Sequence, residues 1–174
     1  MVPPDPMLVE LAADPGRLGG FALSVDGGEP VTHTMPRTEG DVLDLLRSFP
    51  KIARRYAYVE EVGGFIGRHQ PGSHMFTFGR NYGFLLGALQ AERWHTTLIR
   101  PQRWQRALGL GPKGPKRSDN QWKNHLKAEA QRRFPNLKVT LSTADALLIL
   151  EAARLTLPTP LNPKRKEESE QEKS

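Results

Sequence analysis

Short apolar runs recur along the 174-residue chain, and the segments that join them limit how the runs can pair. Residues 7–13 and 19–25 are rich in β-favouring side chains, and a third such run covers residues 29–34. The turn before the third run is Asp26-Gly27-Gly28, whose residues accept the positive φ angles of tight hairpin turns. The chain is therefore predicted to begin as a β-hairpin.

The pattern changes after the third run, where strand-like segments alternate with segments of helical periodicity. Residues 39–49 place their apolar side chains on one helical face. Further helices are predicted at about 74–93, from Pro101 onward, at 118–134 and at 142–155, with strands at 56–62 and 95–99. A hairpin followed by alternating strands and helices indicates an α/β domain, with a five-stranded mixed sheet flanked by helices.

Length and composition favour one domain with polar extensions. The 174 residues suffice for a single hydrophobic core, and the apolar content of 37% is ordinary for a globular protein. Residues 1–6 are proline-rich and are predicted to form a flexible arm. Residues 158–174 are charged and proline-rich, which predicts a disordered tail. The folded domain is expected to cover residues 7–157.

Composition also excludes several kinds of chemistry. The chain has no cysteine, which excludes disulfides, zinc–thiolate sites and cysteine nucleophiles. No segment approaches the roughly 18 to 20 apolar residues of a membrane span. The N-terminus lacks the basic start and apolar core of a signal peptide. We therefore expect a cytoplasmic protein without a membrane partner.

Basic residues are concentrated in the segment 93–139. The formal net charge is +6, and only Asp119 and Glu129 oppose the positive charges of this segment. Its basic residues are Arg93, Arg100, Arg103, Arg106, Lys113, Lys116, Arg117, Lys123, Lys127, Arg132, Arg133 and Lys138. A concentrated basic segment favours a polyanionic partner, with nucleic acid first, although a solvated helical face is the alternative.

Three acids stand at the ends of predicted elements. Asp14 ends the first strand, Glu60 lies near the end of the fourth, and Asp145 lies in the first turn of the last helix. Functional groups gather at the carboxyl ends of strands in α/β sheets, so Asp14 and Glu60 can meet there. A divalent cation such as Mg²⁺ or Mn²⁺ would offset the repulsion between such carboxylates.

The turn after Asp14 is nearly free of side chains. Gly16, Gly19 and Gly20 are expected to leave room for a phosphate backbone to approach a metal held by Asp14. Two metal ions about 4 Å apart can activate water and stabilise the leaving oxygen of a phosphodiester. The pattern therefore favours phosphodiester hydrolysis.

Each acid also has a purely structural interpretation. Asp14 precedes a Pro-Gly pair and can initiate a turn. Glu60 and Glu61 can both face solvent, and only one of them can share the inward face of a strand. Asp145 lies three residues after Ser142, the spacing of a helix capping box. Only the combination of the three acids in a basic chain favours a site.

Five stretches together carry a family resemblance that covers about residues 8–155. They are AADPGRLGGFAL, YVEEV, MFTFGRNYGFLLGAL, IRPQRWQRALGL and STADALLILEAARL. In this order they resemble the RuvC-like Holliday junction resolvases, in particular the phage-type members of the ribonuclease H-like superfamily. The resemblance implies a ribonuclease H-like fold and a nucleoid-associated or phage-encoded protein.

The resemblance also implies an activity and a site. It implies an endonuclease that resolves Holliday junctions with two Mg²⁺ ions, for which Mn²⁺ can substitute. The catalytic and metal-binding residues would be Asp14, Glu60 and Asp145. Family members usually carry an acid or histidine three residues before the last of these. Here that candidate fourth-ligand position holds Ser142, a poor metal ligand, which predicts weaker binding of one ion.

The family works as a homodimer on branched DNA, which implies both a DNA-binding surface and a dimer interface. The DNA contacts would come from Phe65 and Arg68 in the loop 63–73, and from Lys113, Lys116, Arg117, Lys123 and Lys127. Phe65 would stack on bases at the junction centre, or pack in the core instead. The helix at 74–93 carries Gly79, Gly83 and Gly87, which would serve the dimer interface or close packing on the sheet.

Three other functions stay open at this point. Another ribonuclease H-like nuclease would act on RNA or RNA–DNA hybrids. A catalytically weak protein that only binds branched DNA would fit the serine at the fourth-ligand position. A fragment of a sugar-kinase or actin-like fold would also use Asp-x-Gly for phosphate, but the chain is short for the two lobes of those folds.

Overall fold

The computed structural model describes residues 7–51, 53–63, 72–115 and 117–157. The predicted arm at 1–6 and the predicted tail at 158–174 lie outside the described residues. So do three of the expected DNA contacts, namely Phe65, Arg68 and Lys116. Their predicted roles stay predictions.

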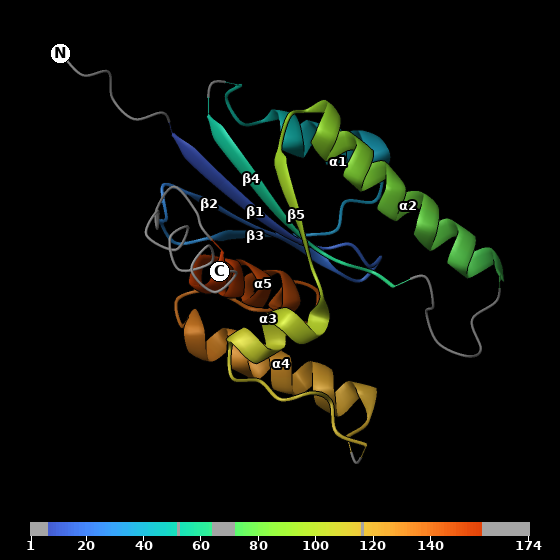
Figure 1. Cartoon of the computed structure of the whole chain (residues 1–174), viewed down its shortest axis with the longest axis vertical. Coiled ribbons are helices and arrows are strands. Elements are labelled where there is room, and N and C mark those ends of the chain that lie inside the picture. Colours follow the sequence, from blue (N-terminus) through green and yellow to red (C-terminus); the bar gives the residue numbers. More distant parts are fainter. Residues whose placement is uncertain (1–6, 52, 64–71, 116, 158–174) are drawn as a thin grey trace, which may run out of the picture.

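A five-stranded mixed sheet forms the centre of the molecule (Figure 1). Its strands are β1 (Leu8–Asp14), β2 (Gly20–Val25), β3 (Val31–Thr34), β4 (Arg54–Glu60) and β5 (His95–Ile99), in the order β3-β2-β1-β4-β5. The first three strands pair antiparallel, whereas β4 is parallel to both β1 and β5. The predicted α/β class and the mixed sheet are confirmed.

The turn between β2 and β3 has the backbone that its residues predict. Asp26 and Gly27 adopt positive φ angles of 49° and 73°. The Asp26 carboxylate also accepts a hydrogen bond from the backbone N–H of Leu8, with 2.8 Å between the two atoms. This contact ties the turn to the first residue of β1.

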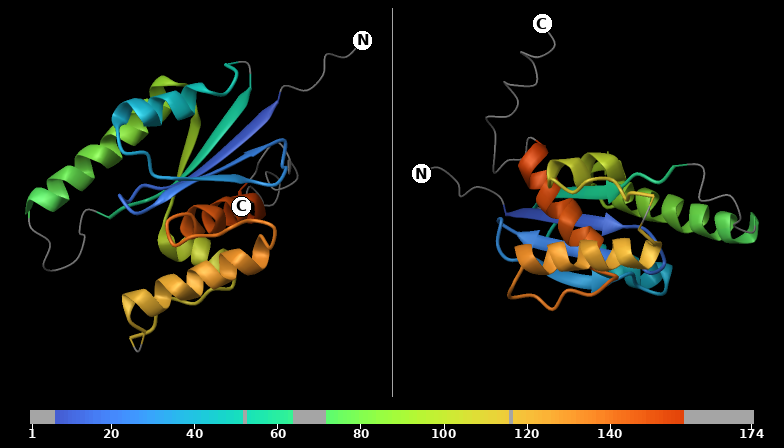
Figure 2. Two further views of the ribbon diagram at one scale, coloured as in Figure 1. Left: turned by 180° about the vertical axis from the view of Figure 1, so that it is seen from behind. Right: turned by 90° about the horizontal axis from the view of Figure 1, so that it is seen from below.

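Helices cover both faces of the sheet (Figure 2). The helices are α1 (Glu39–Arg47), α2 (Gly72–Ala91), α3 (Pro101–Ala107), α4 (Asp119–Arg133) and α5 (Ala144–Thr156). Val9, Leu11 and Ala13 of β1 pack with α1 and α2, while Ala12 packs with α3, α4 and α5. This alternation follows from the two-residue period of a strand.

Helix α5 lies against the middle of the sheet and is mostly buried. Arg154 of α5 donates to Glu10 of β1 at 2.9 Å through Nε, and its Nη2 lies 2.8 Å from the same oxygen. Glu10 is 0% exposed. A carboxylate buried this deeply is tolerated because a guanidinium faces one oxygen and the Tyr58 hydroxyl donates to the other at 3.4 Å.

Two details of the sequence interpretation are wrong. The predicted fourth strand begins at residue 56, whereas β4 begins at Arg54, because its alternating buried positions start there. The capping box that was the structural alternative for Asp145 is absent, since the N-cap of α5 is Thr143 and its side chain accepts no hydrogen bond from the first turn of the helix. Asp145 therefore keeps its carboxylate free of a capping role.

Within the part of the chain that the structure describes, no helix is both long enough and apolar enough to cross a membrane.

Candidate active site

Asp14 and Glu60 lie at the same edge of the sheet, at the carboxyl ends of β1 and β4. These strands are parallel, and their pairing places Ala13 opposite Val59, one residue before each acid. Ala12 and Tyr58, two residues before the acids, both face the helices α3, α4 and α5. Because side chains alternate along a strand, Asp14 and Glu60 point to this same face.

Asp145 joins these two acids from the first turn of α5, which packs on that face of the sheet. The charge of Asp14 acts on both Glu60 and Asp145, and the charge of Asp145 acts on Glu60. The three acids expected from the sequence are therefore close enough to repel one another, although they are far apart in the chain.

The protonation equilibria of the three carboxyl groups reflect this crowding. Burial is the main cause that raises the pKa of Glu60 to about 7, and the charges of Asp14 and Asp145 add to it. Burial and the charge of Asp14 likewise raise the pKa of Asp145 to about 7. Burial also raises the pKa of Asp14, although the backbone N–H of Gly16 opposes the shift. Desolvated carboxyl groups that repel one another favour a positive partner.

Lys123 supplies positive charge next to the acids. It is an exposed residue of α4, and its charge lowers the pKa of both Asp14 and Asp145. Lys127 lies one helical turn further along the same helix, so the two side chains share a face. The sequence predicted these lysines as DNA contacts but gave no reason to place Lys123 beside the carboxylates.

Trp104 holds Glu60 and is a site residue that the sequence interpretation missed. The indole N–H donates to Oε2 of Glu60, with 2.9 Å between nitrogen and oxygen, and the ring is 1% exposed. This hydrogen bond lowers the pKa of Glu60, in opposition to burial. Pro101 begins α3 and Trp104 lies on its first turn. The Pro-x-x-Trp spacing in the sequence is therefore the feature that could have indicated this residue.

Two of the glycines after Asp14 have a packing role that was not predicted from the sequence. A Cβ at Gly19 would lie 2.6 Å from Oδ2 of Asp14, and a Cβ at Gly20 would lie 2.4 Å from the carbonyl oxygen of His33. The small size of Gly19 therefore lets the turn pack against the Asp14 carboxylate, and that of Gly20 lets the start of β2 pack against the backbone of β3. The expected approach of a phosphate backbone along these glycines stays a prediction.

The neighbouring acid and the neighbouring basic residues have partners of their own. Glu61 lies beyond β4 and forms an ion pair with Arg100 at 3.1 Å, so Glu60 alone faces the site. In the basic segment, Lys113 forms an ion pair with Asp119. The guanidinium of Arg117 lies 5.7 Å from the ring centre of Trp122. The two ion pairs are exposed, so each contributes little to stability.

The three acids supply oxygen donors of the type that hard divalent cations prefer. As the side chains stand, no three His, Asp or Glu residues of the described segments form a group that could hold one metal ion. The three carboxylates are nevertheless desolvated and mutually repelling oxygen donors, the kind of ligand that Mg²⁺ and Mn²⁺ prefer. Because the three carboxylates do not form such a group as they stand, binding of a shared metal ion would require them to move closer together.

Ser142, the candidate fourth-ligand position, lies two residues before α5. Its carbonyl oxygen would be 2.8 Å from a Cβ at Gly20, and the residue lines a pocket beside the acids. Its backbone position is therefore set by contact with the start of β2.

Comparisons with known proteins identify the fold. No protein-family model matches the chain, and no curated protein matches it by sequence. Among solved structures, Thermus thermophilus RuvC in complex with a Holliday junction substrate matches with a TM-score of 0.54 and 18% identity, covering 85% of this chain and 93% of that one. A second T. thermophilus RuvC structure matches with a TM-score of 0.53 and 19% identity, covering 85% and 94%. The predicted likeness to RuvC resolvases is thus confirmed at the level of structure, and this chain has the RuvC type of ribonuclease H-like fold.

Proposed function

We propose that this chain is a metal-dependent endonuclease that resolves four-way DNA junctions by hydrolysing phosphodiester bonds. The observation that carries the proposal is the meeting of Asp14, Glu60 and Asp145 at the carboxyl edge of a RuvC-type sheet. The similar T. thermophilus structure holds a Holliday junction substrate. Cleavage of DNA would place the protein in the cytoplasm, as expected from the sequence.

The three carboxylates would hold two Mg²⁺ ions, or Mn²⁺ in their place. When bound, such ions supply an activated water and stabilise the charge on the leaving oxygen. Trp104 donates to one oxygen of Glu60 and so fixes the direction in which the other oxygen can face. Lys123 lies where it can neutralise a phosphate next to Asp14 and Asp145.

Protons compete with the metal in this site. Glu60 and Asp145, each with a pKa of about 7, carry protons through part of the neutral range when no metal is present. A bound cation requires ionised ligands, so metal binding must release these protons. Metal affinity and cleavage are therefore expected to rise between about pH 6 and pH 8.

The basic residues around the site would contact the phosphates of DNA. Lys123 and Lys127 on α4 would act together with Lys113 and Arg117 just before it. Lys116, Phe65 and Arg68 would complete the contacts to the junction. Because these contacts are electrostatic, the affinity for DNA is expected to fall steeply as salt concentration rises.

A homodimer would match the near two-fold symmetry of a four-way junction. Helix α2 is the candidate interface, because a Cβ at Gly79, Gly83 or Gly87 would meet nothing within 4 Å. These glycines therefore do not pack on the sheet, which was the alternative interpretation. Phe76, 75% exposed, lies on the same side of the helix and adds apolar area for a second copy.

A branched-DNA binding protein with little catalysis is the second candidate. It is favoured by the absence, among the described residues, of three ligands grouped closely enough for one ion, and by Ser142 at the fourth-ligand position. This candidate shares the DNA-binding surface and differs only in the chemistry of the acids.

Cleavage of synthetic four-way junctions, duplexes and RNA–DNA hybrids in Mg²⁺ tests the proposal. Asp14→Asn is expected to bind junctions and cut none of them, whereas the matched control Glu61→Gln, whose residue pairs with Arg100 outside the site, keeps the native rate. Binding of junctions without cleavage by the native protein would favour the binding-protein candidate. Preferential cutting of hybrids would redirect the proposal to RNA.

A further inference from the structure

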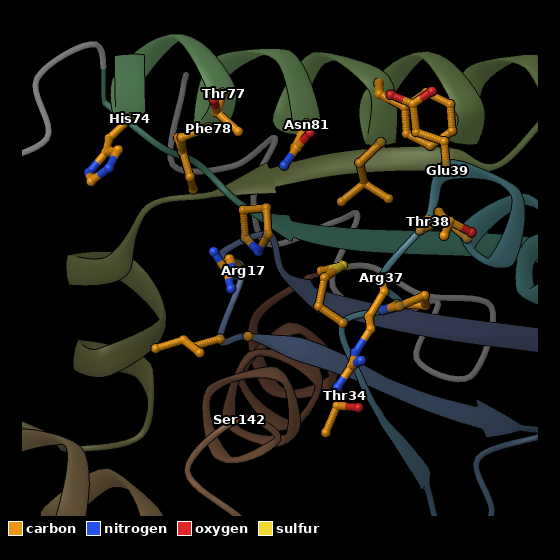
Figure 3. Close-up of a pocket in the computed structure, with 18 of the residues that line it drawn as sticks. Arg17, Thr34, Arg37, Thr38, Glu39, His74, Thr77, Phe78, Asn81 and Ser142 are labelled. Carbon is orange, nitrogen blue, oxygen red and sulfur yellow. The ribbon is translucent and has the colours of Figure 1, made fainter. Parts of the chain in front are cut away.

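A pocket of about 1140 Å³ lies next to the acids without including any of them. One wall is the turn between β1 and β2, and a second is the segment from Thr34 to Glu39 that joins β3 to α1. The third wall is the first half of α2, as Figure 3 shows. This volume lies near the upper end of the roughly 300–1,000 Å³ of typical ligand clefts, so the pocket has room for a segment of a larger ligand.

Gly19 connects this pocket to the candidate active site. Its backbone lines the pocket, and a Cβ on it would lie 2.6 Å from the Asp14 carboxylate. Ser142 also lines the pocket, three residues before Asp145. A chain molecule held at the acids can therefore continue into the pocket across the β1–β2 turn, from one face of the sheet to the other.

The pocket carries positive charge that the described residues do not neutralise. Arg17 and Arg37 are both exposed, and the described residues provide neither with an ion-pair partner. The acid in the lining, Glu39, already accepts a hydrogen bond from Arg80 at 2.8 Å. Two guanidinium groups that no described acid neutralises favour an anionic ligand, and their planar donor geometry suits phosphate.

The opposite wall presents groups that can contact a nucleobase. His74, Thr77 and Asn81 recur at three- and four-residue spacing on α2 and therefore share a face. Figure 3 shows Asn81 and Phe78 extending from the helix toward the wall that holds Arg17. An amide can form paired hydrogen bonds with a base edge, and an aromatic ring can stack on a base.

We propose that this pocket binds a single-stranded segment of DNA that continues from the strand held at the acids. Arg17 and Arg37 contact its phosphates, and the α2 wall receives an unpaired base. A duplex would not use this wall, because paired and stacked bases keep their faces covered. The proposal rests on the proposed nuclease function and adds to it the path of the DNA beyond the scissile phosphate.

Binding to fluorescein-labelled DNA without divalent metal tests this pocket independently of cleavage. One probe is a duplex with a single-stranded tail, and the other is the same duplex with blunt ends. The Arg17→Ala/Arg37→Ala double variant is expected to bind the tailed duplex about tenfold more weakly than the native protein. Its slope of log affinity against log salt should fall by about 1.4, because each neutralised phosphate of a single strand accounts for about 0.7 of that slope.

A matched control removes two positive charges at the other end of the sheet. Arg47 ends α1 and Lys51 precedes β4, whereas Glu60 ends β4. The control is Arg47→Ala/Lys51→Ala, in which both side chains are exposed and Arg47 pairs with Glu92 rather than with a pocket residue. The control is expected to bind the tailed duplex with native affinity. Equal reductions of affinity in the two double variants would attribute the effect to net charge and overturn the proposal.

A third variant tests recognition of the base. Asn81→Ala is expected to weaken binding of a tail with bases and to leave binding of a tail of abasic sites unchanged. Native affinity of the arginine variant for the tailed duplex, or an equal reduction of affinity on blunt and tailed duplexes, would overturn the proposal. Failure of the native protein to cut junctions in Mg²⁺, with tail binding intact, would refute the proposed nuclease function alone.

Discussion

Replacing Glu60 with glutamine should stabilise the folded protein at alkaline pH. The substitution keeps the size of the side chain and an oxygen that can accept from the Trp104 indole, but it removes the buried charge. The pKa of Glu60 is raised from 4.5 to about 7 by burial and by the other two acids. The native state therefore holds this proton more tightly than the unfolded chain does.

The sign and size of the effect follow from that difference. Below pH 4.5 the carboxyl group is protonated in both states, and the folded protein then has its full stability. As pH rises toward 7, the unfolded chain releases the proton more readily than the folded protein does, so the unfolding free energy decreases. At about 1.36 kcal/mol per pKa unit, Glu60 lowers the unfolding free energy, relative to a side chain that stays neutral, by about 3 kcal/mol at pH 8. At pH 5 the folded group is protonated, and ionisation in the unfolded chain lowers the unfolding free energy by about 0.8 kcal/mol. Glu60→Gln is expected to recover most of this cost at pH 8 and little of it at pH 5.

Urea denaturation of both proteins at pH 5 and pH 8 with a chelator measures the two differences in unfolding free energy. Adding Mg²⁺ at pH 8 should stabilise the native protein more than the variant, because a bound ion stabilises by about 2.7 kcal/mol at one hundred times its Kd. A gain that is equal at both pH values would refute the electrostatic reasoning. Destabilisation at pH 8 would refute the burial of an uncompensated charge.

Three further predictions concern other contacts. Trp104→Phe should lower the cleavage rate at pH 7 about tenfold or more, because it removes a hydrogen bond to a charged group, which is worth about 1.5–3 kcal/mol. It should also move the midpoint of the pH–rate profile upward, because this hydrogen bond lowers the pKa of Glu60. An unchanged profile would mean that Trp104 only packs. Gly83→Asp should convert the expected dimer to a monomer, seen by sedimentation, with an unchanged melting temperature; loss of folding would instead place the glycine in the core. Glu10→Gln should lower the unfolding free energy by about 3 kcal/mol, measured in urea, since it leaves Arg154 facing no carboxylate; a decrease under about 1 kcal/mol would contradict this.

The acids at the sheet edge were predictable from the sequence because local patterns carried the information. An apolar run that stops at Asp14, and another that ends in acids, indicate strand ends, and strand ends in α/β sheets gather at one edge. The alternation of strands and helices likewise predicted the class of the fold and placed the element bounds to within about two residues. Asp145 was also singled out by its position in the first turn of the last predicted helix, and the resemblance to RuvC resolvases implied a catalytic role for it.

Contacts between distant segments were decided only by the tertiary structure. Nothing in the local sequence links Trp104 to Glu60 or Lys123 to Asp14, because each pair meets through the packing of helices on the sheet. The same holds for Gly19, whose small size allows close contact with the Asp14 carboxylate. Local sequence determines strand ends, turns and periodicity through backbone preferences, whereas the burial that raises the carboxyl pKa values exists only once the layers have packed.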